Sequence, residues 1–288
     1  MISILRKFKR ALKNIVLHYF SSSVKAYWYE KNHNFGDILN PIFIHELSHK
    51  KVVWINPTTY DYPNYIVIGS ILDRVNRYST IWGAGFISQE SQCPQKPLKV
   101  CAVRGPLTRK KLLESGIECP EVYGDPALLL PKIYSPKIEK KYKLGIIAHY
   151  IDMGNPWIKT INDADILILN IQSENPYDFI DQVYSCEKIA SSSLHGLIVA
   201  DAYSIPSLWL EFSDKVVGKG FKFHDYFMSV GRKDTAPVVV TEKTTINFLL
   251  DNFPSYKIEI DLIKLIKASP FKYAKTLLTH SEGTNDVR

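Results

Sequence analysis

Residues 188–210, KIASSSLHGLIVADAYSIPSLWL, decide how we expect this chain to fold. Apolar runs at 188–191 and 207–210 predict two strands, and the segment 195–203 between them predicts a helix. Serines fill the positions where the first strand passes into the helix. Because serines there can cap a helix and leave backbone N–H groups free, the start of this helix is a favourable place to bind an anion.

The same alternation of strands and helices extends outward from this stretch. Just before it, the pattern predicts strands at 143–150 and 165–170 and a helix at 176–186. An earlier series predicts helices at 41–47 and 106–115, and it has short β-branched or aromatic runs, several of them ending in glycine, at 24–29, 51–55, 65–69, 80–85 and 100–105. Two such series predict an α/β protein with two Rossmann-like domains facing a cleft.

A segment rich in proline and lysine, without periodicity, joins the two series. We expect residues 133–141 to be this linker, between an N-terminal Rossmann-like domain at 23–132 and a C-terminal one at 142–242. The last part of the chain predicts C-terminal helices over 243–280, in two patterns at 243–253 and 256–280, and a disordered tail at 281–288.

The net charge of +7 is concentrated near the N-terminus. Residues 1–30 carry six basic side chains against the single acid Glu30, which leaves about +2 for the other 258 residues. A general nucleic-acid binder would spread basic charge over its folded body, so this distribution disfavours that class. Residues 1–22 predict a basic amphipathic helix, which can lie on an anionic membrane surface through residues 1–20 or pack on its own domain, and both readings stay open.

Several other classes of protein are disfavoured by what the sequence lacks. No apolar run is long enough to span a membrane or to form a convincing signal peptide, so we expect a cytoplasmic protein, soluble or peripheral on the inner face of the cytoplasmic membrane. The cysteines form no C-x-x-C pair, which speaks against a zinc or redox site. A G-x-G-x-x-G motif and a P-loop are also absent, so a dinucleotide or ATP is not favoured, and we expect no metal and no cofactor.

Five polar residues fall at the carboxyl end of a predicted strand or in the loop after it: Asp37, Arg104, Asp125, His149 and His195. Each has an ordinary explanation, since Asp37 can cap the helix that follows Gly36 and Asp125 can form a turn or pair with an arginine. Strand ends of an open parallel sheet share one edge, however, so in two facing halves these residues can share one cleft. His195 is the better acid–base candidate of the two histidines, because it lies in the first turn of a helix beside Gly196.

A second polar group lies further along the chain, where Lys219, Lys222, His224 and Asp225 alternate with aromatic residues. Together with Arg104, the serines at Ser191 and Ser193 and the helix starts, these cations suit a small, highly anionic ligand.

The motifs taken together resemble those of the polysaccharide pyruvyl transferases. The resemblance runs from about residue 27 to 232 and depends on seven segments in the right order, at 34–40 (NFGDILN), 82–85 (WGAG), 103–108 (VRGPLT), 123–127 (YGDPA), 147–150 (IAHY), 193–203 (SLHGLIVADAY) and 222–232 (KFHDYFMSVGR). It implies a fold similar to the GT-B glycosyltransferases. It also implies transfer of a carboxyethylidene group from phosphoenolpyruvate, the donor substrate, to a sugar of a cell-surface polysaccharide precursor, with formation of a pyruvate ketal.

The resemblance implies roles for the matching residues. His195 is expected to be the acid, Arg104 to bind the donor's carboxylate or phosphate, and Asp37 to help with the sugar. Some members of the family have Arg-Leu-His where this chain has Ser193-Leu194-His195, so a second donor-binding arginine is missing. Lys222, Lys219 or Arg232 is expected to replace it.

The chemistry of phosphoenolpyruvate fits this inventory. Its methylene carbon must be protonated before its C2 becomes electrophilic enough for a sugar hydroxyl, which requires a cation clamp and a general acid. We expect His195, Asp37 and His149 to be catalytic. The expected donor ligands are Arg104, Ser191, Ser193, Lys222, Lys219 and Arg232, and the expected acceptor ligands are Asp37, Asn40, Asp125 and Phe223.

Three readings of the function stay open at this point. The first is the pyruvyl transferase, whose acceptor we expect to be a lipid-linked oligosaccharide. A GT-B glycosyltransferase using a sugar nucleotide would share the architecture and the cleft, so the fold alone does not separate the two. A non-enzymatic component of a polysaccharide assembly machine, with a decayed site, is the third, because of the arginine missing at Ser193.

Overall fold

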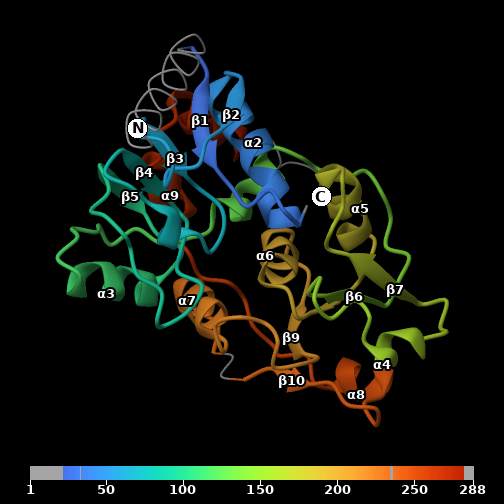
Figure 1. Ribbon diagram of the computed structural model, residues 1–288. Coiled ribbons are helices and arrows are strands. Elements are labelled where there is room, and N and C mark those ends of the chain that lie inside the picture. The colour runs from blue at the N-terminus through green and yellow to red at the C-terminus, as the bar shows by residue number, and fades with distance from the viewer. Residues whose placement is uncertain (1–21, 33, 234–235, 282–288) are drawn as a thin grey trace, which may run out of the picture.

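The computed structural model describes residues 22–32, 34–233 and 236–281. The predicted helix over 1–22 and the predicted tail over 281–288 therefore lie outside the described residues, apart from Ser22 and Ser281. The described chain forms two halves that lie side by side, with helices around and between them (Figure 1).

The N-terminal half is built on a parallel five-stranded sheet. Its order across the sheet is β2-β1-β3-β4-β5, with β1 at Val24–Tyr27, β2 at Val52–Trp54, β3 at Asn64–Ile66, β4 at Ser79–Trp82 and β5 at Lys99–Ala102. Its helices are α2 (Phe35–Ser48), α3 (Pro106–Glu114) and the 3₁₀ helices η1 (Leu72–Arg74) and η2 (Pro126–Lys132). The order reverses direction between β1 and β3, which makes these two strands the topological switch point.

The C-terminal half repeats the same order in its own parallel five-stranded sheet. The order here is β10-β9-β8-β6-β7, with β6 at Leu144–Ala148, β7 at Ile166–Asn170, β8 at Ile189–Ser191, β9 at Ser207–Glu211 and β10 at Val238–Val239. Its helices are α4 (Pro156–Lys159), α5 (Pro176–Tyr184), α6 (Leu194–Ala202), α7 (Phe221–Ser229) and α8 (Ile246–Asp251). The switch point of this sheet lies between β6 and β8.

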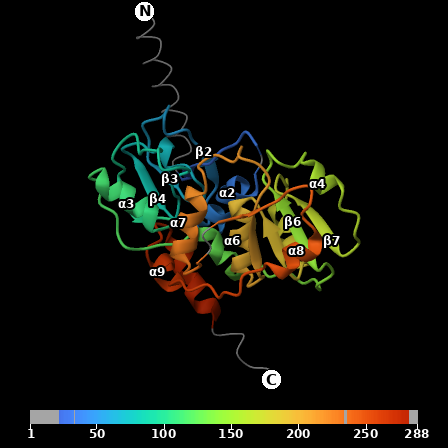
Figure 2. The ribbon, with the colours of Figure 1, turned by 90° about the horizontal axis from the view of Figure 1, so that it is seen from below.

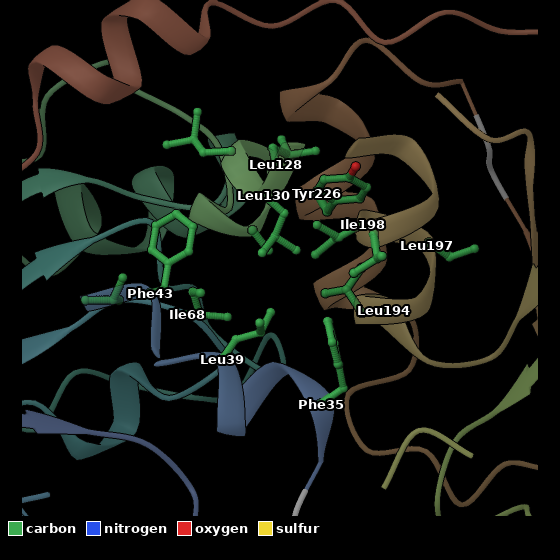
Figure 3. Close-up of a cluster of buried hydrophobic side chains, with 14 of the residues drawn as sticks. Phe35, Leu39, Phe43, Ile68, Leu128, Leu130, Leu194, Leu197, Ile198 and Tyr226 are labelled. Atoms are coloured by element: carbon green, nitrogen blue, oxygen red, sulfur yellow. The ribbon is translucent and has the colours of Figure 1, made fainter. Parts of the chain in front are cut away.

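A shared hydrophobic core joins the two halves (Figure 3). Phe35 and Phe43 of α2 meet Leu128 of η2, Leu194 of α6 and Tyr226 of α7 in one cluster of buried side chains. Since α2 and α6 are the helices that follow β1 and β8, this core fixes the carboxyl ends of the two sheets relative to each other.

The chain crosses back to the N-terminal half after β10. The helices α9 (Leu262–Lys267) and η3 (Lys272–Ser281) pack together, and η3 also packs on α2. The indole Nε1 of Trp82 in β4 donates a hydrogen bond of 3.0 Å to the carbonyl of Leu265, and Phe271 packs against the ring of Tyr65 in β3. The last described segment therefore belongs in space with the first sheet.

The predicted α/β fold with strands and helices in alternation is confirmed, and most expected elements appear within a few residues of their predicted bounds. The interpretation of the halves as Rossmann-like domains of GT-B kind, and the exact domain boundaries, stay predictions. The helical pattern expected over 256–280 is divided in the structure into α9 and η3, and Pro270 lies between them. Proline lacks the backbone N–H and clashes with the preceding turn, so a helix cannot run through it without distortion.

The interpretation of Asp37 as the cap of a helix that follows Gly36 is wrong. Helix α2 begins at Phe35 with Asn34 as its N-cap residue, so Gly36 and Asp37 lie in its first turn. Asp37 does not cap the helix, and accepts a hydrogen bond of 3.2 Å from the backbone N–H of Tyr29 on the preceding loop.

Candidate active site

A cavity of about 300 Å³ opens where the two switch points face each other. Its walls come from the ends of β1, β3, β6 and β8, and they include Tyr27 and Tyr29, Gly69 and Ser70, His149 and Tyr150, and Ser193 to His195. Parallel α/β sheets bind ligands at the carboxyl ends of their strands, at such a reversal. In this chain two reversals contribute to one cavity, which makes it the candidate active site.

His195 lies deep in this cavity, in the first turn of α6. The residue is only 9% exposed, and Gly36 of α2 faces its ring so closely that a Cβ atom on Gly36 would come within 2.2 Å of it. The Nε2 atom of His195 is buried without a hydrogen-bond partner among the described residues. Burial, with Arg104 and Lys222 nearby, lowers the pKa of His195 to about 3, so the imidazole is neutral at neutral pH.

Asp125 lies behind His195, away from the cavity lining. Its Oδ2 is 3.8 Å from Nε2 of His195, and its Oδ1 accepts a hydrogen bond of 3.0 Å from the backbone N–H of Ala127 at the start of η2. Burial raises the pKa of Asp125 to about 6. The position suits a carboxylate that stabilises a protonated His195, whereas contact with an acceptor sugar would require the side chain to reach past the imidazole.

Asp37 lines the cavity on the side of the N-terminal sheet. Burial raises the pKa of Asp37 to about 7, and the hydrogen bond from Tyr29 offsets only part of that effect. A carboxyl group with a pKa near neutrality can take a proton from a hydroxyl and give it back.

His149, after β6, and Lys222 of α7 also line the cavity. The backbone N–H of His149 donates a hydrogen bond of 2.8 Å to Oγ of Ser192, which ties the end of β6 to the end of β8. Burial, with Lys222 nearby, lowers the pKa of His149 to about 4. Burial, with Arg104 nearby, lowers the pKa of Lys222 to about 8.

Arg104 is fully buried and does not line the cavity. Its Nε donates to Asp225 at 3.0 Å, its Nη1 to Oγ of Ser70 at 2.6 Å, and its Nη2 to the carbonyl of Phe86 at 2.6 Å. The predicted contact with a donor would require this guanidinium to leave those partners. In the structure Arg104 acts on the cavity in two ways. It donates a hydrogen bond to Ser70, which lines the cavity, and, in addition to burial, its positive charge lowers the pKa of His195.

The serines at the start of α6 divide between two tasks. Ser193 is the N-cap residue and lines the cavity, but its side chain makes no capping hydrogen bond. Ser191 is fully buried, and its Oγ donates to the carbonyls of Ile147 and Ser193 and accepts from the N–H of Ser193. Ser191 therefore shapes the turn that presents Ser193.

Four further predicted site residues do not line the cavity: Asn40, Lys219, Phe223 and Arg232. The side-chain amide of Asn40 bonds to backbone groups. Its Nδ2 donates a hydrogen bond of 3.0 Å to the carbonyl of Ile68, and its Oδ1 accepts one of 3.0 Å from the N–H of Ile68. Arg232 is held by Asp201, at 3.0 Å. Phe223 stacks on Trp209 with 4.6 Å between ring centroids, and with Lys219 it lines a separate hollow of about 340 Å³.

The structure also brings residues into the cavity that the sequence reasoning missed. They include Arg74 and Asp73 of η1, Asn34 with a buried Oδ1 that lacks a partner among the described residues, and the aromatic residues Tyr29 and Tyr150. Arg74 pairs with Asp73 at 3.2 Å and remains 43% exposed. Arg74 comes shortly after the predicted strand that ends in Gly69. His149 was identified because it lies at the end of a predicted strand, so the same pattern could have pointed to Arg74.

No group of three or more His, Cys, Asp or Glu side chains that could hold a metal occurs within the described ranges. No helix in the described part of the chain is long and apolar enough to cross a membrane.

Comparison with known proteins shows which family the chain belongs to. The family model described as polysaccharide pyruvyl transferase matches residues 4–214, most of the chain. The chain belongs to the polysaccharide pyruvyl transferase family. This enzyme family transfers pyruvyl groups to polysaccharides, so the glycosyltransferase and non-enzymatic readings give way to the first one.

Two relatives of this pyruvyl transferase extend the comparison. An uncharacterized protein of Acanthamoeba polyphaga mimivirus, L143, is 31% identical over 268 residues, which cover 87% of this chain and 88% of that protein. The succinoglycan biosynthesis protein ExoV of Rhizobium meliloti is 26% identical over 220 residues, which cover 72% of this chain and 65% of that protein. A solved structure of a functionally uncharacterized Klebsiella pneumoniae protein aligns with a TM-score of 0.45 and 11% identity over 81% of this chain and 98% of that one.

Proposed function

We propose that this pyruvyl transferase uses phosphoenolpyruvate as its donor and forms a pyruvate ketal on a sugar of a cell-surface polysaccharide precursor. The observation that carries the proposal is the cavity itself, in which Lys222 and Arg74 lie with the neutral imidazole of His195 and the carboxyl group of Asp37. Phosphoenolpyruvate brings a phosphate and a carboxylate, which match two cations and the N–H groups at the start of α6.

The negative charge of the donor favours protonation of His195. A phosphate dianion and a carboxylate beside the ring favour its protonated form, and Asp125 behind it favours the same form. We assign His195 to protonate the methylene carbon of the donor, which leaves C2 electron-poor. The cations hold the anionic groups while this charge develops.

Asp37 then acts on the acceptor. One sugar hydroxyl adds to C2, and Asp37 takes its proton, as its pKa of about 7 permits. Inorganic phosphate leaves with the C–O bond electrons, and a second hydroxyl of the same sugar adds to C2. Of the two hydroxyl protons, one restores the proton that the donor carbon received and the other leaves with phosphate or solvent.

Lys222 and Arg74 take the place of the arginine that is absent at Ser193. Both line the cavity, whereas Lys219 and Arg232, the other replacements expected from the sequence, do not. Ser193 itself lines the cavity at the helix start, so the space that an arginine would fill is open to the donor.

The acceptor in this proposal is a lipid-linked oligosaccharide at the inner face of the cytoplasmic membrane. The basic segment 1–22 supports it, because each basic residue near an anionic surface contributes about 1 kcal/mol of attraction. Deleting residues 1–22 should abolish sedimentation with anionic vesicles. Unchanged sedimentation would show that residues 1–22 do not bind the membrane, and the proposal for the donor would stand.

Thermal unfolding in the presence of candidate donors tests the proposal. Phosphoenolpyruvate should raise Tm, since a ligand that binds only the folded state stabilises by mass action, and sugar nucleotides should not. Mass spectrometry of a lipid-linked glycan incubated with phosphoenolpyruvate should show the ketal adduct. If a sugar nucleotide stabilises the protein and phosphoenolpyruvate does not, the proposed donor is wrong.

His195→Ala tests the assignment of the acid. We expect turnover to fall by about 10²- to 10⁴-fold, the usual loss when a general acid is removed, with Tm little changed. Near wild-type turnover would move the role to another group in the cavity, His149 first.

A further inference from the structure

Helix α7 follows a strand of the C-terminal half but is attached to the N-terminal half. It comes after β9 and packs on α3, and Figure 2 shows it beside the first sheet. Lys222 lies in its first turn and lines the cavity. The attachment of α7 to the N-terminal half therefore decides where this ammonium group lies.

The attachment centres on Asp225, one helical turn after Lys222. Its Oδ2 accepts hydrogen bonds from Nε of Arg104 at 3.0 Å and Oγ1 of Thr108 at 2.7 Å. Its Oδ1 accepts one from the backbone N–H of Thr108 at 2.8 Å. A second nitrogen of the same guanidinium, Nη2 of Arg104, lies 2.9 Å from Oδ2 of Asp225. Both members of this ion pair are fully buried, so the carboxylate has no competing solvent.

Backbone contacts fix the same helix at two places. A Cβ atom on Gly105 would lie 1.8 Å from the carbonyl oxygen of Asp225, so α7 touches the main chain between Arg104 and α3 directly. Before the helix, a Cβ atom on Gly218 would lie 2.0 Å from the carbonyl oxygen of Ile87. Only glycine fits at either contact. The position and rotation of α7 are therefore set before any ligand arrives.

Lys222 is buried without an anionic partner among the described residues. The residue is 8% exposed, and among the described residues no carboxylate pairs with its ammonium group, whose one recorded contact is the ring of Phe223 at 5.4 Å. Residues three apart on a helix lie on the same side, so the side of α7 that Asp225 fixes against Arg104 is also the side that carries Lys222. Burying an unpaired cation costs free energy unless an anion joins it.

We propose that Asp225 is a positioning residue, which holds α7 through Arg104 and Thr108 so that Lys222 is kept inside the cavity as a ligand for the donor's phosphate. This proposal rests on the proposed donor. It also gives Arg104 a task other than the one that the sequence motif implied, because Arg104 places a cation against the donor and does not itself touch it.

Equilibrium binding of phosphoenolpyruvate, measured by calorimetry without an acceptor, tests this in Lys222→Ala, Asp225→Asn and the double variant. Each single change should raise the Kd about 10-fold or more. If Asp225 acts through Lys222, the double variant should bind no more than about twofold more weakly than Lys222→Ala, because the two changes remove the same contact.

Two further variants separate positioning from stability. Leu249→Ala opens a cavity in the separate core under α8, which should lower Tm without changing the Kd. Thr108→Val removes the hydroxyl bond to Asp225, together with the bond of 3.2 Å that the hydroxyl accepts from the backbone N–H of Phe86, and keeps the backbone bond from Thr108 to Asp225. It should raise the Kd by a smaller factor, and it replaces Asp225→Asn should that variant not fold.

The outcomes distinguish this proposal from the proposed function. A Kd unchanged by Asp225→Asn or Thr108→Val while Lys222→Ala weakens binding would overturn the positioning role and leave the donor site standing. Effects that multiply in the double variant would overturn it as well, since Asp225 would then act independently of Lys222. A wild-type protein that does not bind phosphoenolpyruvate at all would remove the proposed donor and this inference together.

Discussion

Burial favours the neutral forms of the titratable side chains that line the cavity, and it shifts their pKa values accordingly. The pKa of Asp37 rises to about 7, that of Lys222 falls to about 8, and that of His195 falls to about 3. The cavity is therefore less charged than its residue types suggest. An anionic donor reverses this, because it favours the protonated forms of Lys222 and His195.

Asp37→Asn isolates one of these groups. The folded protein keeps the proton of Asp37 between about pH 4 and 7, where the unfolded chain has lost it, so Asp37 favours folding below pH 4 and this contribution is lost as the pH rises through 7. The Tm of Asp37→Asn minus that of the wild type should therefore increase by a few degrees from pH 4 to pH 8.

Asp178→Asn is the matched control for that experiment. Asp178 occupies the same place in the first turn of α5 as Asp37 in α2, but its side chain is exposed. The change in its Tm difference over this range shows what the loss of an exposed first-turn carboxylate contributes. A Tm difference for Asp37→Asn that changes no more than that of Asp178→Asn would show that the carboxyl group of Asp37 is not buried as the structure has it.

Among the helices and strands, the crossing of α2 and α6 sets the geometry of the site. Gly36 in the first turn of α2 allows α6 to bring the ring of His195 against it. The strand ends on either side supply the remaining lining, and Ser192 joins β6 to β8 by its hydrogen bond to His149. A glycine inside a helix lowers its stability, so its presence here is explained by the close approach of His195.

Gly36→Ala tests this crossing. A methyl group would overlap the ring of His195 at 2.2 Å, so the imidazole must move, and overpacking of this kind typically costs about 1 to 3 kcal/mol. We expect turnover to fall at least about 10²-fold while the protein still folds, since small misplacements of a catalytic group have effects of that size. Gly154→Ala, with nothing within 4 Å of the added atom, is the control and should keep full turnover. Equal turnover in both variants would show that His195 tolerates displacement.

At the scale of the whole molecule, the two halves are interlocked. Helix α7 leaves the second sheet to pack on α3, and the segment from α9 to η3 leaves the C-terminal half to pack on the first sheet and α2. The core shown in Figure 3 continues across both halves. The cavity between the sheets is thus held on several sides.

Interlocked halves should unfold together. Differential scanning calorimetry should give a single transition in the wild type, and Trp82→Phe, which removes the bond from Trp82 Nε1 to Leu265, should lower its Tm by a few degrees without splitting it. Two resolved transitions, with Trp82→Phe changing only one of them, would contradict this description.

The sequence alone determined the alternation of strands and helices, the strand ends that carry His149 and His195, and, through the order of its motifs, the family. These properties depend on neighbours a few positions apart, since hydrophobic periods of two and 3.6 residues and the glycines at strand ends are local signals. Tertiary structure alone decided which side chains enter the cavity. Arg104 finds its partner in Asp225, 121 positions away, and Asp37 gains its raised pKa from burial. Ion pairing and desolvation join residues that only folding brings together, so no local pattern could assign Arg104 to its contact with α7.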